Sequence, residues 1–383
     1  MKKNNKKIKI AIVYDAIYPY IKGGAEKRNY ELSKQLTRVG YEVHMYGMRL
    51  WGDNKIIKKD GIYLHGISEP KKLYTKKGRR SIWQAVYFGF SCFKLLKEDF
   101  DILEVNHMPF FSLFSAKIVA LLKRKKLYTT WNEVWGKKYW KQYLGQLGTI
   151  AYVIEWLSAR MPDEIIAVSE YTKNRLIEDL KVKTNIVVVP NGIDFELIQK
   201  IKPSKEKIDV IFAGRLLSHK NIDLLIKSIN SLKKTHPNIK TLIIGNGPEK
   251  PKLQELIKEL KLNNNVKIID FLDSHDDLYG LFKSAKLFAF PSSREGFGIS
   301  ALEANACGIP FITINHKDNA TMYLVGKNGN GYSTNFSIAS FAKQIGLILS
   351  ANKYKDKKVY INFAKNFNWE NIFLQNQYIY KNY

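Results

Sequence analysis

The sequence predicts an α/β protein that folds as two doubly wound domains, each a parallel sheet with helices on both faces. Short runs of β-branched and apolar residues alternate with longer amphipathic segments along nearly the whole chain. The alternation stops at a stretch broken by Pro190, Gly192 and Pro203, and it then begins again. The length of 383 residues agrees with two domains, because one domain commonly has roughly 100–200 residues.

The first half opens with the β-branched run 8–15, which we interpret as a strand. Gly23 and Gly24 lie in the loop that follows it, and residues 25–40 have helical spacing up to Gly40. The pattern continues with predicted strands at 41–47, 101–106 and 127–131 and a predicted helix at 112–122. We place the first domain at residues 1–190.

The second half repeats the alternation, and we place the second domain at residues 191–368. Its predicted strands are 208–214, 239–245, 266–272, 287–292 and 309–314. Its predicted helices are 221–234, 251–262, 276–285 and 301–307. Asp276 and Asp277 open one of these helices and are interpreted as its cap. Because open parallel sheets bind ligands at the carboxyl ends of their strands, we expect the chemistry in the loops there.

Charge and composition limit the classes of protein to consider. The chain has 62 basic and 35 acidic residues, a formal charge of 62 − 35 = +27, and the excess is present in both halves. A nucleic-acid-binding protein is one alternative, but no recognised motif and no isolated basic arm supports it. Only two cysteines occur, Cys92 and Cys307, and no secretory signal or run of eighteen apolar residues is found. We therefore expect a cytoplasmic protein without a disulfide framework or transmembrane helix.

Two loops combine features that suit a phosphate group. Gly23 and Gly24 precede a helix whose free N–H groups face an anion, although the same pattern fits a tight turn and is not the dinucleotide-binding G-x-G-x-x-G. In AGRLLSHKNIDLLI, Arg215 and Lys220 lie on either side of a strand-to-helix turn, where two cations suit a diphosphate unless they are merely solvated. Gly247, in GNGPEKPKL, belongs to a close-approach loop or to an ordinary turn.

The most specific pattern is FPSSREGFGISALEANACGIPFI, residues 290–312. Glu295 follows a strand, and Glu303 comes eight residues later in the next helix, with Gly296 and Gly298 between them. Eight helical residues rise about 12 Å, which is comparable with the span from a sugar to the ribose across a diphosphate. We interpret the two carboxylates as groups that recognise hydroxyls.

This pattern resembles the retaining family 4 glycosyltransferases, which have the GT-B fold of two Rossmann-like domains facing each other across a cleft. The resemblance covers nearly the whole chain and is strongest over IIAVSEYTKNRL, VVPNGID, GRLLSHKNIDLLI, IIGNGPE and the E-x7-E motif formed by Glu295 and Glu303. The tail, residues 369–383, is similar to the family's last helix, which crosses back to the first domain.

The resemblance implies a role for each matching residue. Arg215 and Lys220 would neutralise the diphosphate, Glu295 would contact the donor sugar, and Glu303 would hold the ribose hydroxyls. The remaining donor-binding residues that it implies are Gly23, Gly24, Gly247, Asp270, Phe271, Leu272, Gly296, Phe297 and Gly298. One position departs from the family, because Asn132 stands where a His is usual; His107 follows the neighbouring strand and is a candidate to face the same cleft.

The resemblance therefore implies a retaining hexosyltransferase that uses GDP-mannose or a UDP-hexose as donor and a glycan or lipid-linked molecule as acceptor. It implies front-face attack, with Arg215, Lys220 and helix N-termini stabilising the leaving diphosphate. We expect no metal and no cofactor, since the sequence lacks a D-x-D motif. A catalytically silent sugar-nucleotide-binding protein is the main alternative, because Asn132 carries no charge, and a hydrolase or phosphorylase on the same fold is a lesser one.

A membrane is the remaining expected partner. Six of the ten residues 71–80 are basic, the aromatic-rich segment 81–96 follows them, and residues 123–126 form a second basic run. We interpret 81–96 as a core helix and expect the basic loops to contact an anionic membrane surface.

Overall fold

The structure is a computed structural model that describes residues 7–75, 80–327 and 329–381. The chain divides into two compact units, one formed by Met1–Asn191 with Trp369–Tyr383 and one formed by Gly192–Asn368. The boundary expected from the sequence, between residues 190 and 191, lies one residue before this division. The basic residues expected at 76–79 lie outside the described residues.

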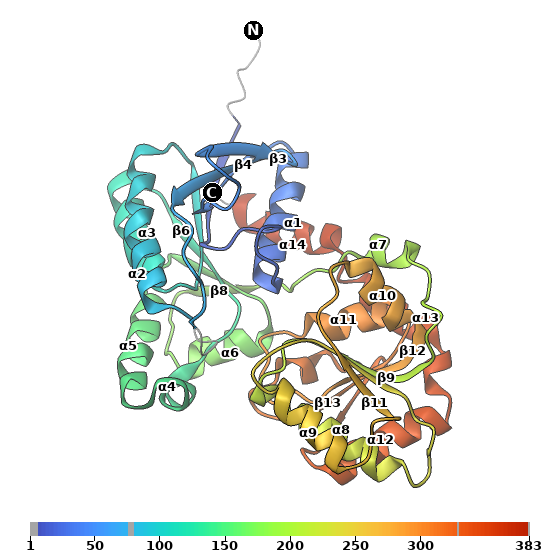
Figure 1. Ribbon diagram of the computed structural model, residues 1–383. Coiled ribbons are helices and arrows are strands. Elements are labelled where there is room, and N and C mark those ends of the chain that lie inside the picture. Colours follow the sequence, from blue (N-terminus) through green and yellow to red (C-terminus); the bar gives the residue numbers. More distant parts are fainter. Residues whose placement is uncertain (1–6, 76–79, 328, 382–383) are drawn as a thin grey trace. The chain divides into compact units, whose positions relative to one another are not determined.

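The sheet of the first unit has the strand order β3-β4-β2-β1-β5-β6-β7-β8 (Figure 1). Its strands are β1 (Lys9–Val13), β2 (Glu42–Met48), β3 (Ile56–Lys59), β4 (Ile62–Ser68), β5 (Ile102–Asn106), β6 (Leu127–Trp131), β7 (Glu164–Ala167) and β8 (Asn185–Val188). Ile10 lies opposite Val43 on one side and Ile102 on the other, so β1 is central and buried. Because β1, β5 and β6 are parallel, the loops that follow them meet at one edge of the sheet.

The hairpin of β3 and β4 adds the antiparallel edge of this sheet. Asp60 and Gly61 form its turn, with φ of 49° and 85°. Positive φ at both central residues is the geometry that Asp-Gly adopts readily, so the turn follows from these two residues.

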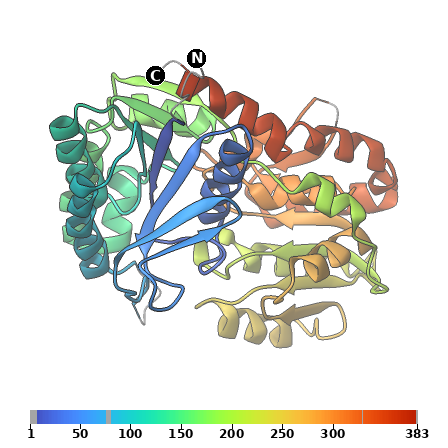
Figure 2. The ribbon, with the colours of Figure 1, turned by 90° about the horizontal axis from the view of Figure 1, so that it is seen from above.

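Helices cover both faces of the first sheet. They are α1 (Gly24–Arg38), α2 (Ile82–Ser91), α3 (Phe111–Lys123), α4 (Gly136–Leu144), α5 (Gly148–Ser158), α6 (Glu170–Glu178) and α14 (Trp369–Lys381), with 3₁₀ turns η1 (Cys92–Lys97) and η2 (Gly145–Leu147). Figure 1 shows α2 and α3 on one side of the sheet and α1 with α14 on the other, and α1 contacts α14 (Figure 2). None of the described helices is long and apolar enough to cross a membrane.

The last helix, α14, is tied to the first unit by a buried polar cluster. Tyr380 Oη donates to the Glu104 carboxylate, and Thr130 Oγ1 donates to the other oxygen over 2.5 Å. The guanidinium of Arg28, in α1, is also buried and donates to the carbonyl of Pro190 over 2.5 Å. The cluster therefore joins β5, β6 and α14 inside one unit.

The segment 81–96 differs from the core helix that we expected. It splits into α2 and η1, and only one side of α2, with Ala85 and Phe88, is buried. Trp83 and Phe90 are 83% and 70% exposed on the other side. The expectation was wrong for this outward side because apolar content alone does not tell a fully buried helix from one with an exposed apolar side.

The second unit is a six-stranded parallel sheet in the order β11-β10-β9-β12-β13-β14. Its strands are β9 (Ile208–Ala213), β10 (Thr241–Ile244), β11 (Val266–Ile269), β12 (Ala285–Phe290), β13 (Phe311–Ile314) and β14 (Gly331–Thr334). Its helices are α7 (Phe195–Lys200), α8 (Ile222–Leu232), α9 (Lys250–Glu259), α10 (His275–Ser284), α11 (Ile299–Ala306), α12 (Ile338–Ser350) and α13 (Lys357–Lys365), with 3₁₀ turns η3 (Ser218–Lys220), η4 (Ala320–Leu324) and η5 (Lys353–Lys355).

The cap of α10 is a correction to the sequence analysis. Ser274 is the N-cap, and its hydroxyl accepts from the N–H of Asp276 at 3.0 Å. Asp276 and Asp277 instead lie in the first turn, where their negative charges interact favourably with the positive end of the helix dipole.

Candidate active site

Lys220 and Glu295 are brought together in the second unit from two different strand-end loops. Lys220 ends η3, which follows β9, and Glu295 lies in the loop after β12. Lys220 Nζ lies 2.5 Å from Glu295 Oε1, and both side chains are 14% exposed. Lys220 Nζ also lies 4.9 Å from the ring centroid of Phe290. The pair is therefore a shielded, hydrogen-bonded ion pair at the carboxyl edge of the sheet.

Main-chain hydrogen bonds fix the loop that carries Glu295. Its N–H donates to the carbonyl of Asp318 at 3.0 Å, and its carbonyl accepts from the N–H of Ala320 at 2.9 Å. Asn319, which lies between these two partners, is fully buried. The backbone of Glu295 is consequently held on both sides.

Gly298 is the turn at which this loop becomes α11. Its φ is +101°, and a Cβ on it would lie 2.4 Å from Thr321 Oγ1, so this position requires glycine. Gly298, the N-cap of α11, has no side chain with which to cap the first turn, and the N-terminus of a helix is a position that suits an anion. Because α11 begins only at Ile299, the eight residues from Glu295 to Glu303 do not form one continuous helix, and the 12 Å rise that we expected for them does not apply.

Glu303 is held by the neighbouring helix α10. Tyr279 Oη donates to Glu303 Oε1 at 2.7 Å, and Tyr279 is fully buried. Burial, followed by the charge of Glu303, raises the pKa of the Tyr279 phenol well above its usual range, so the phenol stays a donor. The sequence analysis predicted Glu303 but not the tyrosine that orients it.

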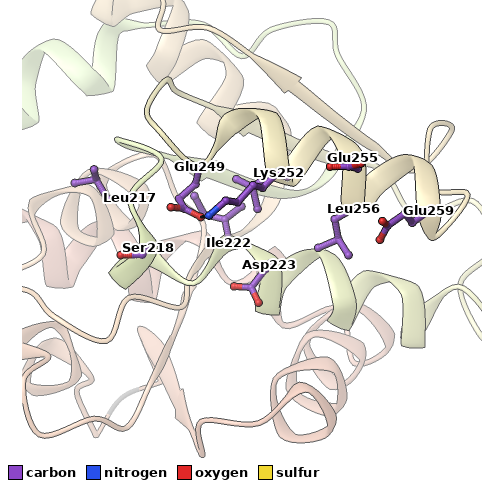
Figure 3. A pocket seen from close by; sticks show the side chains of 10 residues that line it. Leu217, Ser218, Ile222, Asp223, Glu249, Lys252, Glu255, Leu256 and Glu259 are labelled. Atoms are coloured by element: carbon purple, nitrogen blue, oxygen red, sulfur yellow. Dashed lines mark ion pairs between the residues drawn. The ribbon is translucent and has the colours of Figure 1, made fainter. Parts of the chain in front are cut away.

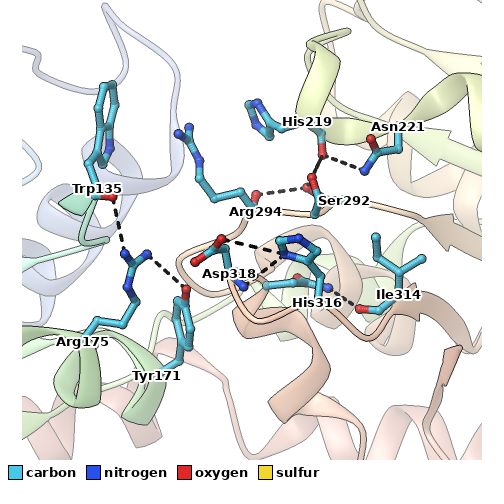
Figure 4. A network of polar contacts seen from close by, with 12 residues as sticks. Trp135, Tyr171, Arg175, His219, Asn221, Ser292, Arg294, Ile314, His316 and Asp318 are labelled. Carbon is cyan, nitrogen blue, oxygen red and sulfur yellow. Dashed lines mark hydrogen bonds and ion pairs between the residues drawn. The ribbon is translucent and has the colours of Figure 1, made fainter. Parts of the chain in front are cut away.

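Further cations act on His219, the residue directly before Lys220. Burial lowers the pKa of His219 to about 3, and the positive charges of Arg294, Lys220 and Arg215 add to the effect. Figure 4 shows the local network, in which the carbonyl of His219 accepts from Ser292 Oγ and Asn221 Nδ2. Three permanent cations therefore lie near one neutral histidine. The sequence analysis missed Arg294, although it directly precedes Glu295.

Gly247 and Asp270, which were also predicted in this unit, have structural partners of their own. A Cβ on Gly247 would lie 2.4 Å from the carbonyl oxygen of Leu216, so this glycine allows two strand-end loops to touch. Asp270 Oδ1 accepts from Asn246 Nδ2 and Lys250 Nζ, each at 2.7 Å. Phe271 is 52% exposed, which leaves its ring available for stacking.

A pocket of about 310 Å³ lies next to this loop region, between η3 with α8 and α9 (Figure 3). Its lining includes four carboxylates, from Asp223, Glu249, Glu255 and Glu259, and one ammonium, from Lys252. None of the residues predicted from the sequence lines it. Its excess of negative charge does not suit a diphosphate, so we place the candidate site at the cationic loops instead.

In the first unit, Glu26 lies over the predicted glycine pair at the start of α1. A Cβ on Gly23 would lie 2.2 Å from Glu26 Oε2, and Tyr14 Oη donates to Glu26 Oε1 at 3.2 Å. Burial raises the pKa of Glu26 above its ordinary value. A carboxylate of the chain itself therefore lies where the sequence analysis expected a phosphate to approach.

Asn132 and His107 lie together at the carboxyl ends of β6 and β5. Asn132 Nδ2 donates to Asn106 Oδ1 at 3.2 Å and lies 3.5 Å from His107 Nδ1. Burial lowers the pKa of His107 to about 4, so this ring is neutral near pH 7. The structure thus places the unusual asparagine beside the histidine that the sequence analysis named with it.

Glu155, which the sequence analysis missed, anchors the loop that follows Asn132. Its carboxylate accepts from the N–H groups of Trp135 and Gly136 at 2.7 and 2.9 Å and from Trp140 Nε1 at 2.9 Å. Burial raises the pKa of Glu155 to about 7, although these three donors oppose the shift. Arg175 supports the same loop by donating to the carbonyl of Val134 at 2.8 Å and to that of Trp135 at 3.4 Å, and Figure 4 shows the second of these bonds.

Comparisons with known proteins identify the family. The family described as "Glycosyl transferases group 1" matches residues 194–367, and "Glycosyltransferase Family 4" matches residues 22–197. A phosphatidylinositol N-acetylglucosaminyltransferase component from Arabidopsis thaliana is 25% identical over 79% of this chain, which spans 66% of that relative, less than two thirds of its length.

Solved structures share the fold at low sequence identity. Sucrose-phosphate synthase from Thermosynechococcus elongatus superposes with a TM-score of 0.80 at 18% identity, covering 98% of this chain and 99% of that one. HepE from Anabaena, in complex with UDP and glucose, superposes with a TM-score of 0.72 at 19% identity, covering 98% and 100%. Together with the two α/β sheets and the Glu295 and Glu303 motif, these matches confirm the predicted GT-B fold, and the chain belongs to the group 1, family 4 glycosyltransferases.

Proposed function

We propose that the protein is a retaining hexosyltransferase that moves a sugar from GDP-mannose or a UDP-hexose to a glycan or lipid-linked acceptor. The observation that carries the proposal is the Lys220–Glu295 pair, with the positive charges of Arg215 and Arg294 acting on the adjacent His219 and with α11 beginning shortly after Glu295. A diphosphate needs several fixed positive groups, and a sugar needs a carboxylate for its hydroxyls. Both are present within one pair of loops.

Each residue has a proposed role in the reaction. Arg215 and Lys220 hold the diphosphate, and Arg294 adds positive charge next to them. Glu295 accepts hydrogen bonds from the donor sugar, and Glu303 accepts them from the ribose. The bond from the anomeric carbon to the diphosphate oxygen breaks on the same face on which the acceptor oxygen attacks. The acceptor proton passes to the leaving diphosphate, so the anomeric configuration is kept.

In this scheme the cations make the largest contribution to stabilising the transition state. Negative charge grows on the leaving diphosphate as the bond breaks, and preorganised positive groups stabilise that charge in a shielded site. Because the ion pair with Glu295 fixes the position of the Lys220 ammonium, this charge is preorganised for the diphosphate. We propose that no metal ion is required.

We propose that Asn132 contributes to donor binding through its side-chain amide and through the adjacent His107. An amide donates and accepts hydrogen bonds but carries no proton in or out of the reaction. We propose that Asn132, beside the neutral His107, binds a hydroxyl of the donor sugar, a role that needs position and not charge.

Ligand binding and turnover give separate tests of this proposal. Either UDP or GDP, together with its sugar nucleotide, should raise the apparent melting temperature of the protein by mass action. The double variant Arg215→Ala/Lys220→Ala should lose that shift, while Lys252→Ala, on the acidic pocket, should keep it. If the double variant binds every nucleotide as the wild type does, the proposed donor site is wrong.

Release of labelled sugar distinguishes the remaining classes. Transfer that requires an acceptor extract supports the transferase, and release to water alone supports a hydrolase. Binding without release supports a silent sugar-nucleotide-binding protein. Tight binding of DNA or RNA, abolished by salt and unaffected by nucleotides, would favour the nucleic-acid alternative.

We also propose that the enzyme works on the cytoplasmic side of a membrane as a peripheral protein. The support is the basic character of the chain and the exposed aromatic side chains of α2. A lipid-linked acceptor would be located in the membrane, so an enzyme that uses it would work at the membrane surface.

A further inference from the structure

One layer of helices in the first unit carries twelve exposed large apolar side chains. The layer consists of α2, η1, α3, η2 and α5. It holds nearly half of the 25 exposed large apolar residues found among the described residues of the chain. We call these residues the apolar helical face: Ile82, Trp83, Tyr87, Phe90, Leu96, Ile118, Leu121, Leu122, Leu147, Ile150, Val153 and Leu157.

The helices of this face pack against one another. A Cβ on Gly89 would lie 2.8 Å from Phe111 Cβ, so α2 touches the start of α3 directly. At the other end of α3, Lys123 Nζ lies 5.5 Å from the ring centroid of Phe100, which comes shortly after η1. The two segments therefore run side by side in the same direction, as Figure 1 shows for α2 and α3, and α3 also contacts α5.

The exposed side of α2 has the composition of a surface that contacts lipid. Trp83, Tyr87 and Phe90 follow the spacing i, i+4, i+7, which puts them on one side of the helix. Trp83 is 83% exposed and Phe90 is 70% exposed, whereas Phe88 on the opposite side is fully buried. A concentration of apolar side chains in contact with water marks a surface that another apolar phase covers.

Charge decides which partner fits this face. The described residues of α2, η1, α3, η2 and α5 include one carboxylate, Glu155, and that carboxylate is fully buried. Arg124 and Lys126, directly after α3, are exposed, as is Lys97 in η1, against one exposed carboxylate, Asp99, shortly after η1. A second copy of the chain would bring the same positive charges against these, and like charges repel. An anionic bilayer supplies both the apolar phase and the opposite charge.

We infer that the apolar helical face is the surface on which the protein lies on an anionic membrane. Trp83 and Phe90 enter the boundary between headgroups and acyl chains, and the basic residues at the ends of α3 and η1 contact lipid phosphates. The inference deepens the peripheral location in the proposed function and rests on it. It differs from the sequence-based expectation, which gave the contact to the basic loops and buried the helix.

Vesicle binding with a local probe tests the inference. The protein is mixed with vesicles of phosphatidylcholine alone or with 30% phosphatidylglycerol, whose acyl chains are brominated in a parallel set, and tryptophan fluorescence is recorded. Bromine quenches only a ring that it touches. Trp83→Phe keeps an aromatic ring there, so it should bind the anionic vesicles as the wild type does but show less quenching. The difference between the two reports on Trp83 itself, one of seven tryptophans.

Matched variants separate this face from the general positive charge of the chain. Trp83→Ala/Phe90→Ala should weaken partitioning about tenfold or more. Arg124→Gln/Lys126→Gln should weaken it by about fivefold for each charge removed. Tyr323→Ala/Leu347→Ala and Lys252→Gln/Lys355→Gln, which change exposed residues of the second unit, should leave it unchanged.

Three outcomes would overturn the inference. The first is equal binding of the wild type and the two face variants. The second is unquenched Trp83 in protein that is bound to vesicles. The third is a dimer that the face variants dissociate, without any vesicle binding, since it would make the face a protein interface. Nucleotide binding by the same variants keeps the tests apart: if it persists while vesicle binding of the wild type fails, only the membrane inference is wrong.

Discussion

Lys220 Nζ and Glu295 Oε1 lie 2.5 Å apart, and the two residues come from loops that are 75 positions apart in the sequence. The pair has a direct consequence for donor binding. Glu295 competes with an incoming diphosphate for the same ammonium, so Glu295→Gln should bind UDP or GDP at least as tightly as the wild type. Turnover should fall, because the amide no longer holds the donor sugar as a carboxylate does.

Lys220→Met should behave in the opposite way. It removes the ammonium, so nucleotide binding should weaken and turnover should drop by about 100-fold or more. Isothermal titration with UDP and GDP and a single-turnover assay measure the two effects. Equal loss of nucleotide binding in Glu295→Gln and Lys220→Met would contradict the assignment of separate roles.

Asn132 should matter for position and not for proton transfer. Asn132→Ala should lower turnover, and unchanged turnover would show that Asn132 has no such role. Burial lowers the pKa of His107 to about 4, so the rate of the wild type should show no inflection from this group between pH 6 and 8. The pH profile of turnover, measured at saturating donor, checks this point.

Removal of divalent metal should leave the activity intact. The proposed charges on the diphosphate are met by Arg215, Lys220 and Arg294, which remain after treatment with EDTA. Initial rates before and after chelation make the comparison. Complete loss that Mg²⁺ or Mn²⁺ restores would contradict the proposal.

Tyr380→Phe should destabilise the first unit. The change removes the donor to the buried Glu104 carboxylate while keeping the ring, and an unsatisfied buried acceptor costs about 1–3 kcal/mol. Urea unfolding followed by circular dichroism measures the difference. Leu374→Ala is the control. The Leu374 side chain lies on the same helix and is 62% exposed, so its removal should have little effect on the free energy of unfolding.

His65 should make stability depend on pH in the acid range. Its Nε2 lies 2.8 Å from His44 Nδ1, and burial, with the smaller influence of His44, lowers the pKa of His65 to about 4. An unfolded histidine has a pKa of about 6.5, so the unfolded state binds the proton first. The contribution is present in full above that pH and decreases as pH falls toward 4.

The difference between the wild type and His65→Gln isolates this contribution from other titrating groups. The free energy of unfolding of the wild type relative to this variant should fall by about 2 kcal/mol between pH 7 and pH 4.5. Urea titrations at the two pH values give the number. A difference that stays the same at both values would show that His65 does not titrate as expected.

The sequence indicated the two parallel sheets because buried parallel strands appear as apolar runs separated by amphipathic helices. β6 agrees with its predicted range at both ends, and α8 lies within its predicted range. The hairpin of β3 and β4 was not predicted, although Asp60-Gly61 is a recognisable signal for its turn. The burial of residues 81–96 could not be predicted from the sequence, because it depends on which segments cover α2 in three dimensions.

The candidate site shows the same limit. A motif at fixed spacing predicted Glu295 and Glu303, and strand-end positions predicted Arg215 and Lys220. Tyr279, Glu155 and His219 come from distant segments or act through burial, and neither property has a local signal in one sequence. Contacts within each unit, and not residue type, give these side chains their positions: Glu155 in the first unit, and Tyr279 and His219 in the second.

The attachment of α14 to the first unit has a consequence for biosynthesis. The first unit needs two distant parts of the chain, because Glu104 is translated long before its partner Tyr380. The second unit is one uninterrupted stretch, residues 192–368. The second unit is therefore free to fold while the first still lacks its closing helix. A released chain truncated after residue 368 should hold a protease-resistant second unit beside a first unit that trypsin still cuts.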